Sequence, residues 1–131
     1  MPSIDLVDET FVAADPARVV AVVADPTSWL RWWPDLELTV FMDRGSQGLR
    51  WNVRGALHGS SEIWVEPVGD GAVLHYYLRA EPAAGPLPDT VPGRRAADRA
   101  RRSRAVRWKR HTWELKDLLE GARRPGTPAA R

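Results

Sequence analysis

The chain has 131 residues, the size of one ordinary domain, and its 44% hydrophobic and 27% charged content is globular, not disordered. Because it has no cysteine, it can form neither a disulfide framework nor a thiolate metal site. A signal peptide is not visible at the N-terminus, and no apolar run is long enough to cross a membrane. We therefore expect a cytoplasmic protein with no transmembrane segment.

The net charge of +2 conceals two regions of opposite charge. Residues 1–90 carry 6 Arg against 13 Asp or Glu, a net charge of −7, whereas residues 91–131 carry 13 Lys or Arg against 4 Asp or Glu, a net charge of +9. We expect the acidic part to neutralise the basic part in some measure when the two pack together. A basic segment also raises the possibility of an acidic partner.

The first part of the chain predicts a strand and two short helices. Apolar and polar residues alternate from Ile4 to Ala13, which is typical of a strand. Asp15 followed by Pro16 predicts an N-cap and a first helical position. A second short helix is expected over about Thr27 to Trp33, where Pro34 ends it.

From Leu36 onward the apolar period changes to two, which predicts an antiparallel meander of about four strands. Gly69-Asp70-Gly71 predicts a hairpin between the last two of them. On the inner face we expect Met42 and Leu49 in the core. On the outer face, an aromatic patch of Phe41, Trp64 and Tyr77 is the basis for a hypothesis of homodimerisation through the sheet.

A long helix is predicted from Pro92 to Gly121, about 42 Å in length, and only this element is large enough to cover the sheet. Its C-terminal half presents an apolar stripe and should close the core. Its N-terminal half presents Ala and Arg, so it either lines a cavity or projects beyond the sheet into water. Residues 1–121 are thus predicted to form one domain and residues 122–131 a disordered tail.

The element order and three phrases, AADPARVVAVVADPTSW, RWWPDL and RWKRHTWELKDLLEG, resemble the polyketide cyclase/dehydrase-like branch of the START-like (SRPBCC, Bet v 1-like) superfamily. The resemblance implies an α+β helix-grip fold, in which a curved antiparallel sheet wraps around the C-terminal helix. It also implies an apolar cavity that holds a lipid, polyketide, hormone or quinone, and in a minority of members cyclisation or dehydration. This chain departs from the family pattern in having fewer strands, about five.

Five residues are candidates for contact with a ligand. Trp51, Tyr76 and Trp108 are predicted to face inward, where they either enclose an apolar molecule or simply pack the core. Arg104, which lies on the inward-facing stripe of the long helix, either recognises a carboxylate or enolate or pairs with an acidic residue of the sheet. His111 either contacts a ligand, as a hydrogen-bonding group or as an acid or base, or is a core residue bonded to a backbone carbonyl.

No metal-ligand spacing, phosphate loop, dinucleotide fingerprint or definite catalytic motif is present, so we expect no metal and no cofactor and leave open whether the chain is an enzyme.

The dense basic run of the long helix is interpreted as a solvated face, because we expect its interleaved aromatic residues to face the core. Three functional hypotheses follow. The first is binding of a small hydrophobic ligand, the second is a cyclase or dehydratase, and the third is nucleic-acid binding or assembly through this basic run. The members of the basic run are Arg94, Arg95, Arg99, Arg101, Arg102, Arg104, Arg107, Lys109 and Arg110.

Overall fold

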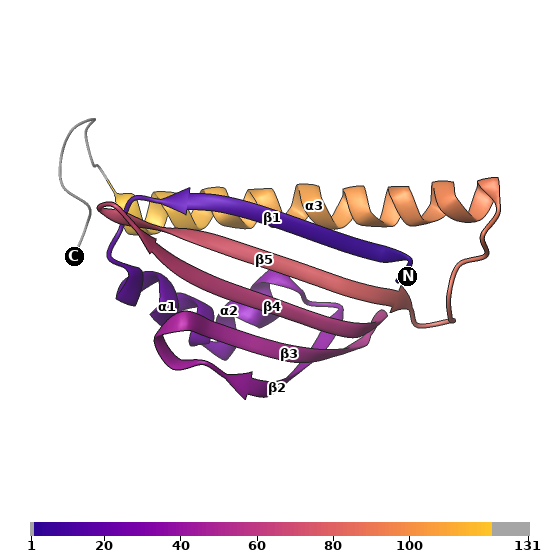
Figure 1. Cartoon of the computed structure of the whole chain (residues 1–131), viewed down its shortest axis with the longest axis horizontal. Helices are drawn as coiled ribbons and strands as arrows, with labels where there is room; N and C mark the ends of the chain where they lie inside the picture. Colours follow the sequence, from indigo (N-terminus) through magenta and orange to yellow (C-terminus); the bar gives the residue numbers. More distant parts are fainter. Residues whose placement is uncertain (1, 122–131) are drawn as a thin grey trace.

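The computed structural model describes residues 2–121 and shows a five-stranded antiparallel sheet with a long C-terminal helix (Figure 1). The elements in chain order are β1 (Ile4–Val12), α1 (Pro16–Ala24), α2 (Pro26–Trp32), β2 (Leu36–Asp43), the 3-10 turn η1 (Gly45–Gln47), β3 (Gly48–Gly55), β4 (Leu57–Val68), β5 (Gly71–Pro82) and α3 (Val91–Glu120). The predicted helix-grip architecture is confirmed, including the two short helices and the reduced number of strands. The tail predicted for residues 122–131 lies outside the described residues.

The strand order is β1-β5-β4-β3-β2, so β1 closes one edge of the meander by pairing with the last strand. The first short helix begins at Pro16 after the N-cap Asp15, as predicted, whereas the second begins at Pro26, one residue before its predicted start. Asp15 and Asp25 each accept a hydrogen bond from the backbone N–H group two residues later. The backbone and side-chain hydrogen bonds from Thr27 hold the pKa of Asp25 below its ordinary value. Thr90 caps α3 in the same manner, through the N–H of Gly93.

The core lies between the inner face of the sheet and the helices. α1 packs on β3, β4 and β5, whereas α3 packs on β1 and α2 and runs the length of the molecule (Figure 1). The C-terminal half of α3 supplies four buried side chains, Trp108, Thr112, Leu115 and Leu119, as the apolar stripe predicted. From the N-terminal half, only Ala100 and Ala105 pack against the core as partly buried apolar residues.

One predicted core residue is misplaced. Met42 was expected on the inner face beside Leu49, but a β-bulge between Val40 and Met42 adds an unpaired residue, Phe41, to strand β2. Because side chains alternate between the two faces of a strand, one extra residue reverses the faces that follow. Met42 therefore lies opposite Arg50 and is 42% exposed, whereas Leu49 is buried as expected.

None of the helices within residues 2–121 combines the length with the apolar character that a bilayer crossing requires. In the same part of the chain, no group of three or more His, Asp or Glu side chains lies close enough together to hold a metal ion.

Candidate functional site

Six aromatic side chains meet beneath α3 in a single cluster, which we call the aromatic cluster. Trp33, which directly follows α2, lies at its centre. Its ring stacks on Tyr76 of β5 at a centroid distance of 5.6 Å and on Trp108 of α3 at 5.6 Å. Trp51 of β3 meets the edge of Trp33 at 5.7 Å. The members of the cluster are Trp29, Trp32, Trp33, Trp51, Tyr76 and Trp108.

The cluster brings three of the five predicted site residues together. Tyr76 and Trp108 are in direct contact, with ring centroids 4.5 Å apart, and Trp51 joins them through Trp33. Trp51, Tyr76 and Trp108 are 0%, 1% and 1% exposed. The space between the sheet and this part of α3 is thus filled by aromatic side chains, each pair contributing about 0.5–1.5 kcal/mol beyond burial.

Two buried donors in the cluster have no hydrogen-bond acceptor among residues 2–121. They are the indole Nε1 atoms of Trp51 and Trp108. A buried polar group without a partner costs about 1–3 kcal/mol, so each of these N–H groups is available to an acceptor atom of a bound molecule. By contrast, the Tyr76 phenol has the side chains of Ser61 and Trp33 as partners, and burial raises its pKa, so it stays protonated at neutral pH.

Arg104 is paired with an acidic residue of the chain, which is the second of the two roles predicted for it. Its guanidinium donates two hydrogen bonds to the carboxylate of Asp35, at 3.0 and 2.6 Å. Asp35 lies in the turn immediately before β2, not within the sheet as expected. Burial alone would raise the pKa of Asp35, but the hydrogen bonds and positive charge of Arg104 outweigh burial and lower it. The Arg104–Asp35 ion pair links α3 to the segment that carries Trp33.

His111 lies apart from the rest of the predicted site, in a groove of about 220 Å³ between α2 and α3. Its Nδ1 atom is buried, 3.8 Å from the carboxylate of Glu114, and has no hydrogen-bond partner among the described residues. The predicted bond to a backbone carbonyl is therefore absent at that nitrogen. A second groove, of about 340 Å³, opens between α2 and β2 and is mainly apolar. Its lining residues are Pro26, Trp29, Leu30, Leu36, Glu37 and Leu38.

Sequence reasoning missed the central residue of the cluster. Trp32 and Trp33 entered only as part of the RWWPDL resemblance, because two adjacent tryptophans at the end of a seven-residue helix have no periodicity that predicts which way they face. Pro34 was the available signal in the sequence, because a proline ends the helix and restricts the backbone of the residue before it, Trp33.

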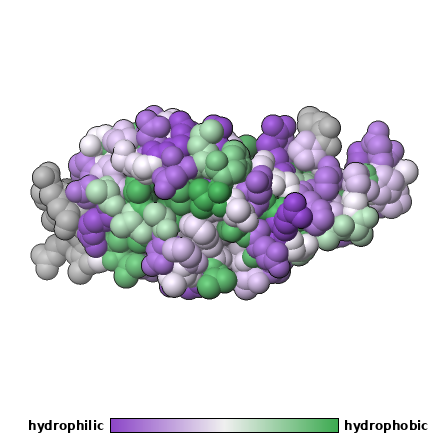
Figure 2. Space-filling view, turned by 90° about the horizontal axis from the view of Figure 1, so that it is seen from below, coloured by the Kyte–Doolittle hydropathy of each residue, from purple (hydrophilic) through white to green (hydrophobic). Residues whose placement is uncertain are grey.

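The outer face of the sheet carries the predicted aromatic residues in different settings. Phe41 is exposed, and Tyr77 lines a groove of about 310 Å³ beside it. Trp64 instead stacks on His75 at 4.3 Å. His75 is buried between the carboxylates of Glu66 and Glu9. On another side of the molecule, where Figure 1 places α1, α2 and β2, Figure 2 shows apolar surface bordered by polar residues.

No model of a protein family matches the chain, and no curated protein matches its sequence. Solved structures do match. The Aha1 dimer from Colwellia psychrerythraea is 12% identical, with a TM-score of 0.60 over 92% of this chain and 99% of that one. Protein CV1439 from Chromobacterium violaceum is 15% identical, with a TM-score of 0.60 over 89% and 98%. A START superfamily protein from Mycobacterium smegmatis is 14% identical, with a TM-score of 0.49 over 88% and 97%.

The chain has a helix-grip fold, which it shares with the Aha1 and CV1439 structures. At these identities the similarity establishes the fold of the helix-grip domain and leaves its ligand and activity to the chemistry of its own residues.

Proposed function

We propose that this helix-grip domain binds a small hydrophobic or aromatic ligand, such as a lipid, a polyketide or a quinone-like molecule, between the sheet and α3. The observation that carries the proposal is the pair of buried indole N–H groups, of Trp51 and Trp108, that have no acceptor within residues 2–121. A ligand with one carbonyl or hydroxyl oxygen would satisfy such a donor, while its apolar body would contact the aromatic rings. Arg104 and His111 are candidate contacts on the two sides of Trp108.

The ligand would enter by displacing Trp33. This ring stacks on both Tyr76 and Trp108, with centroids 5.6 Å from each, and those two rings are 4.5 Å apart, so a planar ligand in the place of Trp33 would contact both. The displaced segment is short, since α2 has seven residues and is flanked by the two grooves described above. The stacking lost by Trp33 would be regained by the ligand, so the exchange requires little net change in contact energy. Entry through the apolar α2–β2 groove would pass the exposed side chain of Leu30.

Titration with 2-methyl-1,4-naphthoquinone, followed by tryptophan fluorescence, tests this proposal. We expect saturable quenching at micromolar concentrations, because stacking on Tyr76 and Trp108 brings the quinone against the cluster. Leu30→Glu should weaken binding at least tenfold by placing a charge at the entrance, and its exposure makes the variant safe for folding. Val68→Glu, which alters another exposed apolar residue at the far end of β4, is the matched control; Val68 is 41% exposed and Leu30 is 69% exposed. Quenching that stays linear, or equal losses in both variants, contradicts the proposal.

We further propose that two copies associate through the outer face of the sheet. Large apolar residues are exposed at both edges of the sheet, Val7 and Phe11 on β1 and Phe41 and Met42 on β2, and exposed apolar surface of this kind is typical of interfaces. The Aha1 protein with the same fold is described as a dimer, which is in keeping with this idea.

Light scattering at high protein concentration should then give twice the chain mass of 14.7 kDa. Val7→Lys combined with Phe41→Lys should restore the single-chain mass, because two charges would be desolvated in the interface. Leu118→Lys alters an exposed apolar residue of α3 away from the sheet and should leave the mass unchanged. A wild-type mass of one chain at millimolar concentration would rule out the association.

A further inference from the structure

The face of α3 that points away from the core carries a row of six residues, which the exposed Asp117 continues four residues later. Their spacings are 4, 3, 4, 4 and 3, so they lie above one another along about 27 Å of helix. All six are solvent-exposed, and four are arginines. The members of this outer row are Arg95, Arg99, Arg102, Val106, Arg110 and Trp113.

The outer row also contains an aromatic residue. Trp108, the tryptophan within the basic run, faces the core as predicted, whereas Trp113, three residues after the end of the run, is 63% exposed. The solvent face of α3 therefore carries an exposed indole in line with four guanidinium groups.

The acidic body of the protein leaves this row unneutralised. Cations on the flanks of α3 are paired with the body, Arg104 with Asp35 and Lys109 with Asp8 at 2.8 Å. In the outer row, the one ion-pair partner of Arg102 among the described residues is the neighbouring Asp98, at 3.5 Å. Arg95, Arg99 and Arg110 make no ion pair or hydrogen bond with any residue in the described part of the chain. Their charges are therefore available to an external anion.

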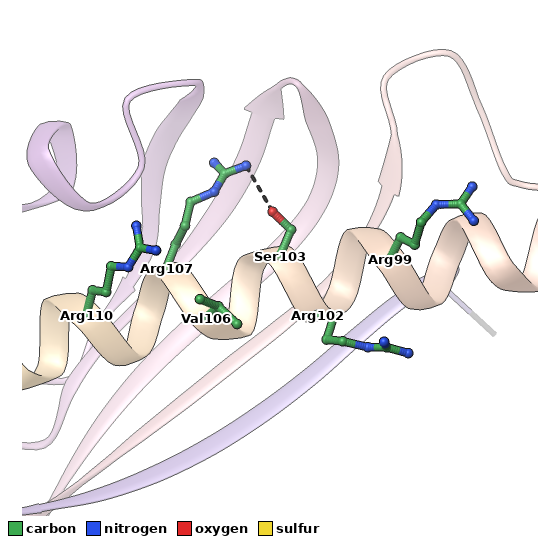
Figure 3. Close-up of a pocket in the computed structure, with 6 residues that line it drawn as sticks. All are labelled: Arg99, Arg102, Ser103, Val106, Arg107 and Arg110. Atoms are coloured by element: carbon green, nitrogen blue, oxygen red, sulfur yellow. Dashed lines mark hydrogen bonds between the residues drawn. The ribbon is translucent and has the colours of Figure 1, made fainter.

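The arginine side chains frame a shallow hollow of about 440 Å³ on the helix surface. Figure 3 shows Arg99, Arg107 and Arg110 extending to one side of the helix and Arg102 to the other, with Val106 between them. Arg107 is bonded to Ser103 at 3.3 Å, which holds its guanidinium along this side. The helix is thus a convex ridge with cations on both flanks.

We propose that the outer row of α3 binds the phosphate backbone of double-stranded DNA along the major groove. A groove about 12 Å wide admits a convex helix, and phosphates on both walls would meet cations on both flanks. Guanidinium groups bind phosphate with two parallel hydrogen bonds, and the row contains only Arg as its cation. A membrane surface fits less well, because Val106 and Trp113 are its only apolar side chains.

Fluorescence anisotropy of a labelled 20-base-pair DNA duplex, measured at several salt concentrations, tests the proposal. Four arginine–phosphate contacts predict that affinity falls about 150-fold between 50 and 200 mM salt. Arg99→Gln with Arg110→Gln removes two contacts and should reduce that fall to about 12-fold, with weaker binding at 50 mM. Trp113→Ala should leave the salt dependence unchanged, since it removes no charge.

The matched control is Arg31→Gln with Arg54→Gln, which removes two exposed arginines on α2 and β3 and should keep the 150-fold fall. No binding at 50 mM salt, or the same reduction in both double variants, overturns the proposal. Tighter binding to vesicles of phosphatidylcholine with 30% phosphatidylserine than to the duplex, lost in Arg99→Gln with Arg110→Gln, would assign the row to a membrane instead. Because the outer row lies opposite the aromatic cluster on α3, none of these results bears on ligand binding.

Discussion

Replacing Trp108 with alanine is expected to lower the free energy of unfolding by about 3–5 kcal/mol, the largest effect of any single change that we predict. Trp108 is 1% exposed and contacts the rings of Trp32, Trp33 and Tyr76. Its removal would leave a cavity between α3 and the sheet, which close-packed neighbours cannot fill by small shifts. Urea unfolding followed by far-ultraviolet circular dichroism measures the loss, and Trp108→Leu, with a smaller expected loss, serves if the alanine variant does not fold.

Trp113→Ala is the matched control, because it makes the same substitution on the same helix. Its side chain faces solvent, so we expect a change within about 0.5 kcal/mol. Equal losses at the two positions would show that helix propensity, and not the aromatic cluster, determines the effect. A small loss at Trp108 alone would mean that the cluster collapses around the vacancy.

The sequence was sufficient to predict the helices and strands because their ends are marked locally. Asp15 before Pro16 and Asp25 before Pro26 supply both an N-cap and a first helical residue, and the period of two identifies the strands. The bulge at Phe41 has no such marker in the sequence. An extra residue leaves the types of residue in the strand unchanged and only reverses the faces on which the side chains after it lie. For this reason Met42 was misplaced while Leu49, which pairs beyond the bulge, was placed correctly.

The site was predictable where a residue's face follows from periodicity, as it does for Trp51, Tyr76 and Trp108. It was not predictable where position depends on distant parts of the chain. Arg104 and Asp35 are separated by 69 positions in sequence, so only the packing of α3 against the end of α2 brings them together. Whether a cavity remains between the sheet and α3 also depends on which side chains occupy that space. Trp33 occupies it, and because this residue directly follows α2, no helix or strand periodicity predicts where its side chain points.

Replacing Arg104 with glutamine is expected to lower the free energy of unfolding by about 1–2 kcal/mol at pH 7. The substitution removes two charged hydrogen bonds that join α3 to Asp35, while the partly exposed carboxylate regains water, which keeps the loss below that of a fully buried pair. The effect should depend on pH. Because the pKa of Asp35 is lowered in the folded protein, its stabilisation is complete above the ordinary value of 3.8 and is lost as the pH falls through the folded-state pKa.

Urea unfolding of wild type and Arg104→Gln, compared from pH 7 down to pH 3, should therefore show a difference that shrinks as the pH falls. Arg102→Gln is the matched control, since Arg102 is exposed and its distance to Asp98 is 3.5 Å, and we expect a change within about 0.5 kcal/mol. Combining Arg104→Gln with Asp35→Asn should cost less than the two single losses added together, because each single change already breaks the pair. Fully additive losses, or a difference that grows on acidification, would show that Arg104 stabilises the fold by packing its aliphatic stem and not through Asp35.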